Sequence, residues 1–338
     1  MPDLKIKTPT GTIVFNYVIS TPSKASASSI NPALPTILFL HPVYLGKIIY
    51  HQQFADRHLR RFNLVGLDLR LHGQTQGKLG KGYGREVAAQ DVGLFMAKLK
   101  IQKYHLFGMS MGGCIGLQTA MLFPSCVLSV FVVSSLPLTE PPDVGEGRLE
   151  IYEYWEEGVR SGGSFEGSAM SDAIVGSLQL SVNNLPVPIV DAMLRASKDC
   201  MMAQWSTDRL ADFRTASVDF FTLRKAYTTT AMRAIACPVY LLHCGADVAY
   251  TLADTQQVAD HLRTAGVAVK VGQVADAPHF GALTHPKEVN KIYHQFILGL
   301  CAGAPPPVPP HAESPFADRL AAVGWDSDDG SDSEEFFI

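Results

Sequence analysis

Short, uninterrupted apolar runs occur in the first 135 residues of the chain and again after residue 235. They are rich in Val, Ile, Leu and Phe and lack the polar alternation of a strand with one wet face. Such runs are typical of strands that are covered on both sides. The pattern predicts strands at residues 36–41, 63–69, 105–109, 127–133, 239–243 and 269–274.

Stretches with helical periodicity follow several of these predicted strands. They cover residues 50–61, 85–98, 111–122, 253–265 and 286–300. Strands that alternate with helices predict the α/β class, with a mostly parallel, twisted sheet flanked by helices. Residues 4–7 and 12–19, separated by Pro9-Thr10-Gly11, predict an antiparallel hairpin ahead of this sheet.

The alternation stops between residues 136 and 235, where helical patterns occur without a clear strand. These patterns lie at residues 149–160, 189–196 and 208–232. We therefore divide the chain into a core of residues 1–135 and 236–300 and an inserted helical cap of residues 136–235. Ligands of parallel sheets bind outside the carboxyl ends of the strands, so we expect the cap to cover that edge.

The composition changes again at Cys301, where a proline-rich stretch is followed by an acidic run. Because proline lacks an amide donor and like charges repel, we predict a disordered tail over residues 301–338. A chain that ends near Gly303 should then match the full chain in melting temperature and turnover. For the terminal Phe336-Phe337-Ile338 two interpretations stay open, a frayed end and a weak docking segment for a partner.

Charge and composition exclude several classes of function. The six acids of residues 324–338 account for more than the whole net charge of −4, so the remainder is nearly neutral. That balance does not provide the dense basic surface that duplex nucleic acid requires. No apolar run approaches the ~20 residues of a membrane span, and the N-terminus lacks the apolar segment of a signal peptide. Since we see no signal segment, we expect a cytoplasmic protein with reduced cysteines. We expect no metal or cofactor, and the six cysteines are scattered without the spacing of a zinc site.

The sharpest local motif is Gly108-Met109-Ser110-Met111-Gly112, a GxSxG pattern. It begins where a predicted strand ends and opens the predicted helix at residues 111–122. A serine on such a strand-to-helix turn projects at the carboxyl edge of the sheet, and the helix N-terminus favours developing negative charge. The motif predicts that Ser110 is a nucleophile.

A nucleophilic serine needs a base and an orienting acid, and candidates of both kinds follow the last two predicted strands. Asp247 follows the strand at residues 239–243, and His279 follows the strand at residues 269–274. Both are expected at the same sheet edge as Ser110, in the order Ser, Asp, His of nucleophile-elbow hydrolases. Asp276 is our second choice for the acid and Glu140 the third.

With these residues, the chain resembles the α/β-hydrolase superfamily, in its cap-bearing esterase and lactonase branch, over roughly residues 1–300. The segment from Leu67 to Thr75 is similar to the family's D-x-R-G-H-G-x-S loop, with Leu71 where glycine is usual. We expect Asp68 and His72 to shape that loop rather than to catalyse.

The segment His41-Pro42-Val43-Tyr44-Leu45-Gly46 occupies the place where this family has His-Gly. The resemblance implies that the amides of Val43 and Met111 form the oxyanion hole. Pro42 stands at the glycine position and restricts His41 without removing the donor at Val43.

The predicted cap contains aromatic and methionine side chains, of which Trp155, Met201 and Trp205, with Tyr44 from the core, are our candidates for the substrate pocket. Packing within the cap is the alternative role for the cap residues. The sequence shows no paired Arg or Lys cluster for a charged substrate, so we expect a small, mainly apolar molecule.

These observations favour a serine hydrolase that cleaves a carboxylic ester or lactone through an acyl-enzyme. The same triad acting on a carbon–carbon bond, on an amide or N-terminal peptide, or in acyl transfer is the alternative. A ligand-binding protein that retains the fold without catalysis is a third hypothesis, because fold alone does not determine function.

Overall fold

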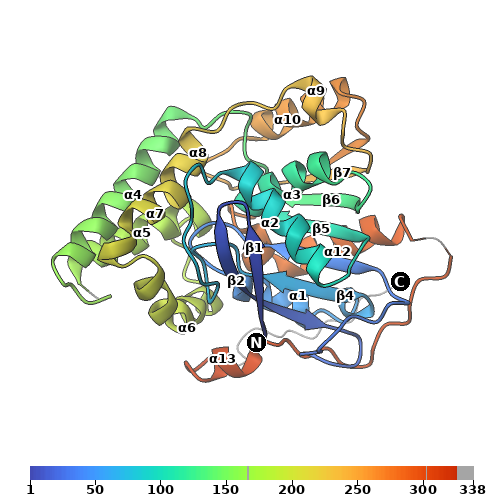
Figure 1. Ribbon diagram of the computed structural model, residues 1–338, viewed down its shortest axis with the longest axis horizontal. Coiled ribbons are helices and arrows are strands. Elements are labelled where there is room, and N and C mark those ends of the chain that lie inside the picture. The colour runs from blue at the N-terminus through green and yellow to red at the C-terminus, as the bar shows by residue number, and fades with distance from the viewer. Residues whose placement is uncertain (166, 302, 326–338) are drawn as a thin grey trace.

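The computed structural model describes residues 1–165, 167–301 and 303–325 (Figure 1). At its centre lies an eight-stranded sheet in the order β1-β2-β4-β3-β5-β6-β7-β8. The strands are β1 (Asp3–Thr8), β2 (Gly11–Ser20), β3 (Thr36–Leu40), β4 (Asn63–Leu67), β5 (Tyr104–Met109), β6 (Val127–Val133), β7 (Val239–Cys244) and β8 (Val269–Val274). The pairs β1–β2 and β2–β4 are antiparallel, and all other neighbours are parallel. The predicted α/β architecture is therefore confirmed.

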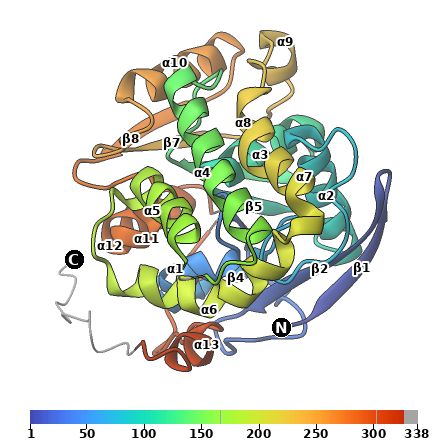
Figure 2. The same cartoon turned by 90° about the vertical axis from the view of Figure 1, so that its left-hand side faces the viewer.

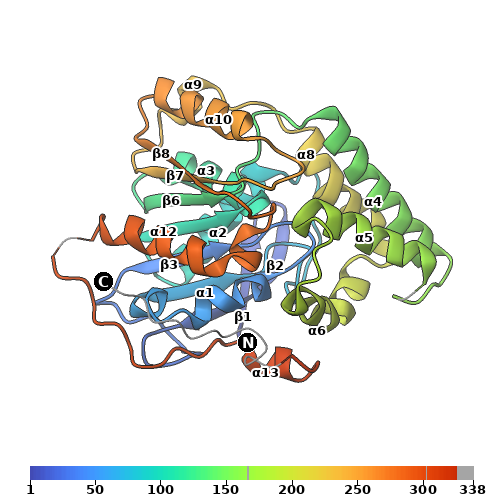
Figure 3. The same cartoon turned by 180° about the vertical axis from the view of Figure 1, so that it is seen from behind.

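Helices cover both faces of the sheet (Figures 1 and 3). One face carries α2 (Arg85–Lys98), α3 (Met111–Leu122) and α10 (Leu252–Thr264). The other carries η1 (Lys47–Tyr50), α1 (His51–Ala55), η2 (Leu59–Arg61), α11 (Gly281–Thr284) and α12 (Pro286–Leu298). Tyr293 of α12 packs against Phe107 and Phe131 of the central strands, with ring centroids 4.8 and 4.9 Å away. Because both faces are covered, the central strands are apolar throughout, as their sequence pattern predicts.

A block of helices connects β6 to β7 and lies across one end of the sheet, as Figure 2 shows. It comprises α4 (Pro142–Arg160), α5 (Ser168–Val182), α6 (Pro188–Gln204), η3 (Thr207–Arg209), α7 (Leu210–Arg214), η4 (Thr215–Asp219), α8 (Phe220–Thr222) and α9 (Thr229–Met232). Its side chains and backbone reach the loops that follow β4, β7 and β8, for example through the bonds from Trp205 Nε1 to Leu71 O and from Phe280 N to Ser181 O. These helices therefore cover the carboxyl edge of the sheet.

The helix α5 was absent from the sequence prediction. Its Ser, Gly and Ala content gives a weak periodicity, and it is held by packing on α4 instead. A Cβ at Gly176 would lie 2.9 Å from Cγ1 of Ile151, so glycine permits the close contact. The single helix expected at residues 208–232 is instead a series of short segments.

The prediction of a disordered tail is wrong for residues 303–325. Prolines cannot donate a backbone hydrogen bond, but their carbonyls accept, and three arginines near α1 and η2 supply the donors. The bonds run from Arg57 to Pro309 O, from Arg60 to Glu313 O and from Arg61 to Pro306 O. The acidic run and Phe336-Phe337-Ile338 lie outside the described residues.

The short helix α13 (Ala317–Ala321) adds apolar burial to this attachment. Phe316 and Leu320 are fully buried, and Phe316 contacts Phe54 with ring centroids 5.5 Å apart. Arg319 donates to the carbonyl of Ala196 in α6, so α13 lies beside the block of helices over the sheet edge (Figure 2).

Removal of residues 304–338 should therefore lower the melting temperature by about 5–10 °C, because two apolar side chains lose burial worth about 1.5–3 kcal/mol each. Calorimetry measures the change. Removal of residues 326–338 alone is the matched control and should leave the melting temperature unchanged. Equal melting temperatures for all three chains would show that the attachment of α13 contributes nothing to stability.

Candidate active site

Ser110 lies on the turn between β5 and α3, with φ 52° and ψ −116°. A serine in this backbone conformation is strained and persists only where its surroundings fix it. The flanking glycines provide the space: a Cβ at Gly108 would lie 2.5 Å from the carbonyl carbon of Gly112. A Cβ at Gly112 would lie 1.9 Å from the carbonyl oxygen of Leu40. The α3 N-terminus thus closes against the end of β3 and holds Ser110 at the carboxyl edge.

The structure brings Ser110, His279 and Asp247 into one hydrogen-bonded line. His279 Nε2 lies 2.8 Å from Ser110 Oγ, and His279 Nδ1 lies 2.6 Å from Asp247 Oδ2. The other oxygen of Asp247 accepts from the amides of Ala249 and Tyr250, at 2.9 and 3.1 Å. Since the carboxylate is held by two amides, it fixes the imidazole with Nδ1–H donating and Nε2 free to accept from the serine.

The alternative acids lie elsewhere. Asp276 is exposed on the turn after β8. Glu140 is buried, but its carboxylate pairs with Arg148 at 2.7 Å and with Arg224 at 3.0 Å. Neither carboxylate is hydrogen-bonded to His279, whereas Asp247 is.

Two contacts of His279 were absent from the sequence analysis. Ser134 Oγ donates to the carbonyl oxygen of His279 at 2.6 Å, and the Tyr250 ring packs edge-on against the imidazole with centroids 5.2 Å apart. Ser134 directly follows β6, and Tyr250 follows Asp247 by three residues, so position at the sheet edge was the available signal. Ser134 restrains the backbone of His279, and Tyr250 restrains its ring.

The loop that follows β3 lies against the α3 N-terminus, as an oxyanion hole formed by Val43 and Met111 would require. His41 Nδ1 donates to Pro42 O at 2.7 Å, and its Nε2 accepts from the Leu69 amide at 2.9 Å. Tyr44 has a φ of 75°, a second strained residue in this loop. Among the described residues the Val43 amide has no hydrogen-bond partner, which leaves it available to a ligand.

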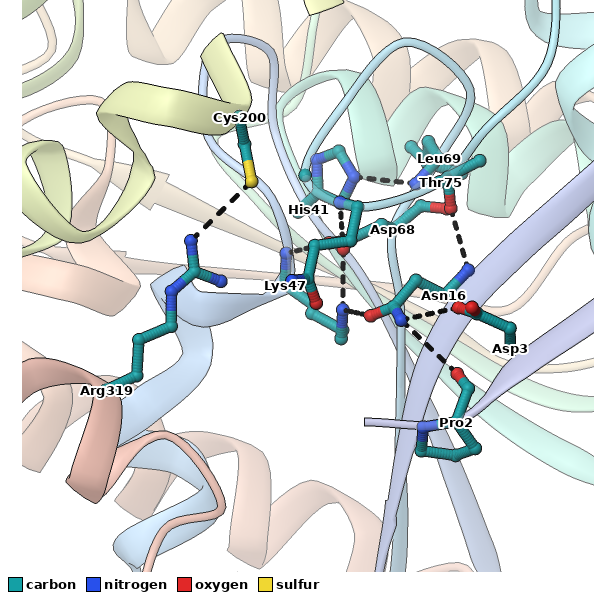
Figure 4. Close-up of polar contacts among 12 residues, drawn as sticks. Pro2, Asp3, Asn16, His41, Lys47, Asp68, Leu69, Thr75, Cys200 and Arg319 are labelled. Carbon is teal, nitrogen blue, oxygen red and sulfur yellow. Dashed lines mark hydrogen bonds and ion pairs between the residues drawn. The ribbon is translucent and has the colours of Figure 1, made fainter. Parts of the chain in front are cut away.

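The Asp68 carboxylate holds together the loops near His41, as Figure 4 shows. It pairs with Lys47 Nζ at 2.5 Å and accepts from the backbone amides of Lys47 and Gln74 at 2.7 and 3.0 Å. A Cβ at Gly73 would lie 2.2 Å from its Oδ2. Asp68 therefore ties the loop after β4 to η1, in agreement with the loop-shaping role expected for it. Leu71 occupies the usual glycine position with a φ of 64°.

The candidate pocket residues separate into two groups. Tyr44, Met201 and Trp205 share a cavity of about 10 Å³, room for roughly one water molecule. Trp155 does not line that cavity; its Nε1 donates to the carbonyl of Trp205 at 2.8 Å, and its ring packs among cap aromatics. Ser110 has no exposed surface and His279 is 1% exposed, so substrate entry requires the covering helices to move.

No helix in the described part of the chain has the length and apolar character needed to cross a membrane. Within the same residues, no group of three or more His, Cys, Asp or Glu side chains could hold a metal ion.

Part of the chain is similar to known proteins. Residues 35–173 match the family model described as the alpha/beta hydrolase fold. A segment of 136 residues is 30% identical to a protein of Wickerhamomyces anomalus named "Probable alcohol acetyltransferase", and covers 38% of this chain and 38% of that protein. The chain thus spans about two fifths of the length of that curated relative.

Two solved structures share the architecture. The thermophilic esterase of Thermogutta terrifontis is 17% identical, with a TM-score of 0.64 over 89% of this chain and 100% of the esterase. The enol-lactonase of Burkholderia xenovorans LB400 is 19% identical, with a TM-score of 0.61 over 87% of this chain and 100% of the lactonase. At these identities the similarity establishes the fold.

The buried histidines of the loops beside Ser110 should make the protein sensitive to acid. Burial lowers the pKa of His41 to about 3 and that of His72 to about 4, so both are neutral in the folded chain. The unfolded chain binds protons below pH 6.5 and the folded chain does not, so stability falls as pH drops from 6.5 toward 4. Each histidine contributes a slope of about 1 kcal/mol per pH unit in that window.

Replacement of His72 by Phe should reduce this slope by about 1 kcal/mol per pH unit between pH 6 and 4.5, because the ring is retained and its titration removed. Urea unfolding at several pH values measures it. The same exchange at the exposed His311 is the control. An unchanged slope in the His72→Phe protein would contradict a neutral, buried His72.

Proposed function

We propose that this chain, whose residues 35–173 match the alpha/beta hydrolase fold model, is a serine hydrolase that cleaves a carboxylic ester or lactone of a small molecule through an acyl-enzyme on Ser110. The observation that carries this proposal is the hydrogen-bonded line from Ser110 through His279 to Asp247. The base His279 lies 2.8 Å from the nucleophile Ser110 and 2.6 Å from the orienting acid Asp247. Such an arrangement is the requirement for activating a hydroxyl that is otherwise a weak nucleophile.

In the acylation step, Ser110 Oγ attacks the carbonyl carbon while its proton passes to His279 Nε2. Asp247 keeps the Nδ1–H bond throughout and stabilises the imidazolium that forms. The tetrahedral oxyanion lies between the amides of Val43 and Met111, and the N-terminus of α3 adds a favourable dipole. His279 then returns the proton to the leaving alcohol, which departs and leaves the acyl group on Ser110.

In deacylation, a water molecule gives its proton to His279 and attacks the acyl carbonyl. The acid product leaves, and the proton returns to Ser110. The covering helices act by excluding other water from the site, which strengthens the oxyanion contacts. Tyr44, Met201 and Trp205 line a small cavity that Ser110 and His279 do not line, so they would contact a substrate only after the covering helices move.

Acyl transfer to an alcohol is the second candidate. The complete burial of Ser110 favours it, because limited access of water lets another hydroxyl compound compete for the acyl group. The relative named as an alcohol acetyltransferase is consistent with that reaction. Cleavage of a carbon–carbon or amide bond would use the same side chains, but no further observation favours it.

Replacement of Ser110 by Ala should lower kcat for p-nitrophenyl butyrate by at least about 10⁴-fold and abolish labelling by a fluorophosphonate. Ser135→Ala, a buried serine near the same sheet edge, is the control and should retain both activities. Labelling that survives in Ser110→Ala would place the nucleophile elsewhere. With ethanol present, ethyl butyrate in excess of butyrate would identify the transferase instead of the hydrolase.

The acid of the triad is tested by a pair of matched substitutions. Asp247→Asn should lower kcat by about 10³–10⁴-fold, because the amide favours the wrong imidazole tautomer. Asp276→Asn should change kcat less than twofold. Steady-state rates at pH 7 decide between them, and a reversal of the two effects would assign the orienting role to Asp276.

A further inference from the structure

A buried charged cluster lies beside the candidate active site, and its charges do not balance. Glu140 pairs with Arg148 at 2.7 Å and with Arg224 at 3.0 Å. The three side chains are 2%, 0% and 3% exposed, respectively. One carboxylate therefore serves two guanidinium groups, and the cluster carries a net charge of +1 away from water.

Two other fully buried ion pairs of the core, Lys47–Asp68 and Arg70–Asp91, are balanced. Lys47 pairs with Asp68 alone. Arg70 holds Asp91 through two bonds of 2.6 and 2.7 Å and uses its remaining nitrogen on a carbonyl and a threonine hydroxyl. A buried charge without a partner costs several kcal/mol, so folds pair such charges. Arg60 is likewise buried without a carboxylate, but its two terminal nitrogens donate to four backbone carbonyls and it lies far from Ser110 in the chain. The excess charge at Arg148 and Arg224 lies next to the candidate active site.

Unused hydrogen-bond donors accompany the excess charge. Among the described residues, Arg148 Nη1, Arg224 Nε and the Tyr44 hydroxyl are buried and have no hydrogen-bond partner. Asp247 does not fill this role, because its two oxygens are taken by His279 and by two backbone amides. Unsatisfied buried donors of this kind are expected where a ligand supplies the acceptor.

The Arg148 guanidinium lies near two tyrosines, of which Tyr250 packs on the His279 ring. Its Nη2 donates to the Tyr250 hydroxyl at 2.9 Å, and the Tyr250 ring packs on His279. Tyr44 directly follows Val43. Burial raises the pKa of Tyr44, and the nearby charge of Arg148 opposes that effect. The guanidinium stacks on Phe221, with its carbon 3.6 Å from the ring centroid, which fixes its plane.

We propose that Arg148 and Tyr44 bind a carboxylate of the substrate, so that the ester or lactone is a monoanion with a carboxylate near its scissile carbonyl. The inference rests on the proposed function and specifies its substrate class. A buried guanidinium nitrogen and a tyrosine hydroxyl that both lack an acceptor match the oxygens of a carboxylate, and the excess arginine of the cluster favours an anion. Arg148 lies on α4 and Arg224 in the loop after α8, so their proximity is not visible in the sequence, from which a mainly apolar substrate is expected. The proposal replaces that expectation with a monoanion.

A size-matched pair of esters tests the proposal: monoethyl glutarate, which carries the carboxylate, and ethyl valerate, which does not. Hydrolysis is followed by pH-stat titration for the wild type, Arg148→Met, Tyr44→Phe and Arg160→Met. Arg148→Met leaves Glu140 paired with Arg224. Arg160→Met removes an exposed arginine from the same helix and is the control.

The wild type should prefer monoethyl glutarate by at least about tenfold in kcat/KM. That preference should disappear in Arg148→Met and fall about tenfold in Tyr44→Phe, because a hydrogen bond to a charged group is lost. Arg160→Met should keep it. A wild type that prefers ethyl valerate, or equal losses for both esters in the two pocket variants, would overturn the proposal in favour of a structural cluster. If Arg148→Met does not fold, Tyr44→Phe gives the decision.

Calorimetric binding separates this proposal from the proposed function. Ser110→Ala should bind monoethyl glutarate at least tenfold more tightly than ethyl valerate, and Ser110→Ala/Arg148→Met should lose that difference. If this result is obtained and the wild type cleaves neither ester, the carboxylate site stands and the esterase proposal fails. No difference in binding overturns the carboxylate site. Inorganic phosphate that binds as tightly as monoethyl glutarate would overturn the assignment to a carboxylate.

Discussion

The close approach of α3 to the end of β3 is the constraint on which the rest of the site depends. The backbone at Gly112 lies so near the carbonyl of Leu40 that any Cβ would collide with it. This contact sets the helix N-terminus against the loop that begins at His41 and forces the strained conformation of Ser110. Ser110 is fixed by β5 before it and α3 after it, and α3 in turn packs against β3, so the core of the sheet holds the serine in place.

The block of helices between β6 and β7 covers this site and is attached to the core by other interactions than those that join the strands of the sheet. Hydrogen bonds from Trp205 to Leu71 and from Gln204 to Thr75 seat α6 on the loops of the core. The attachment of α13 to α6 through Arg319 adds a third point. The first two contacts join a helix end to a loop and none of the three is part of the sheet's hydrogen bonding, so we expect the helices over the edge to move when a substrate enters the closed site at Ser110.

Much of the fold and the central line of the site could be predicted because their signals are local. The strands are continuous apolar runs, the GxSxG turn is five residues long, and Asp247 and His279 each follow a strand. Parallel strands end at one edge, which brings residues far apart in the chain together. The helix α5 and the docking of α13 could not be predicted, because they depend on partners such as Ile151 and Arg60 that lie far away in sequence. The cluster of Glu140, Arg148 and Arg224 could not be predicted for the same reason, because Arg224 lies far from the other two in the sequence.

The central claim is that Ser110 carries the acyl group during turnover, and mass spectrometry of a slowly deacylating enzyme tests it most directly. After reaction with p-nitrophenyl pivalate and acid quench, the protein should gain the mass of one pivaloyl group. Proteolysis should locate that group on Ser110 within the turn between β5 and α3. A pivaloyl group on another residue, or continued release of p-nitrophenol by a protein that lacks Ser110, would contradict the account.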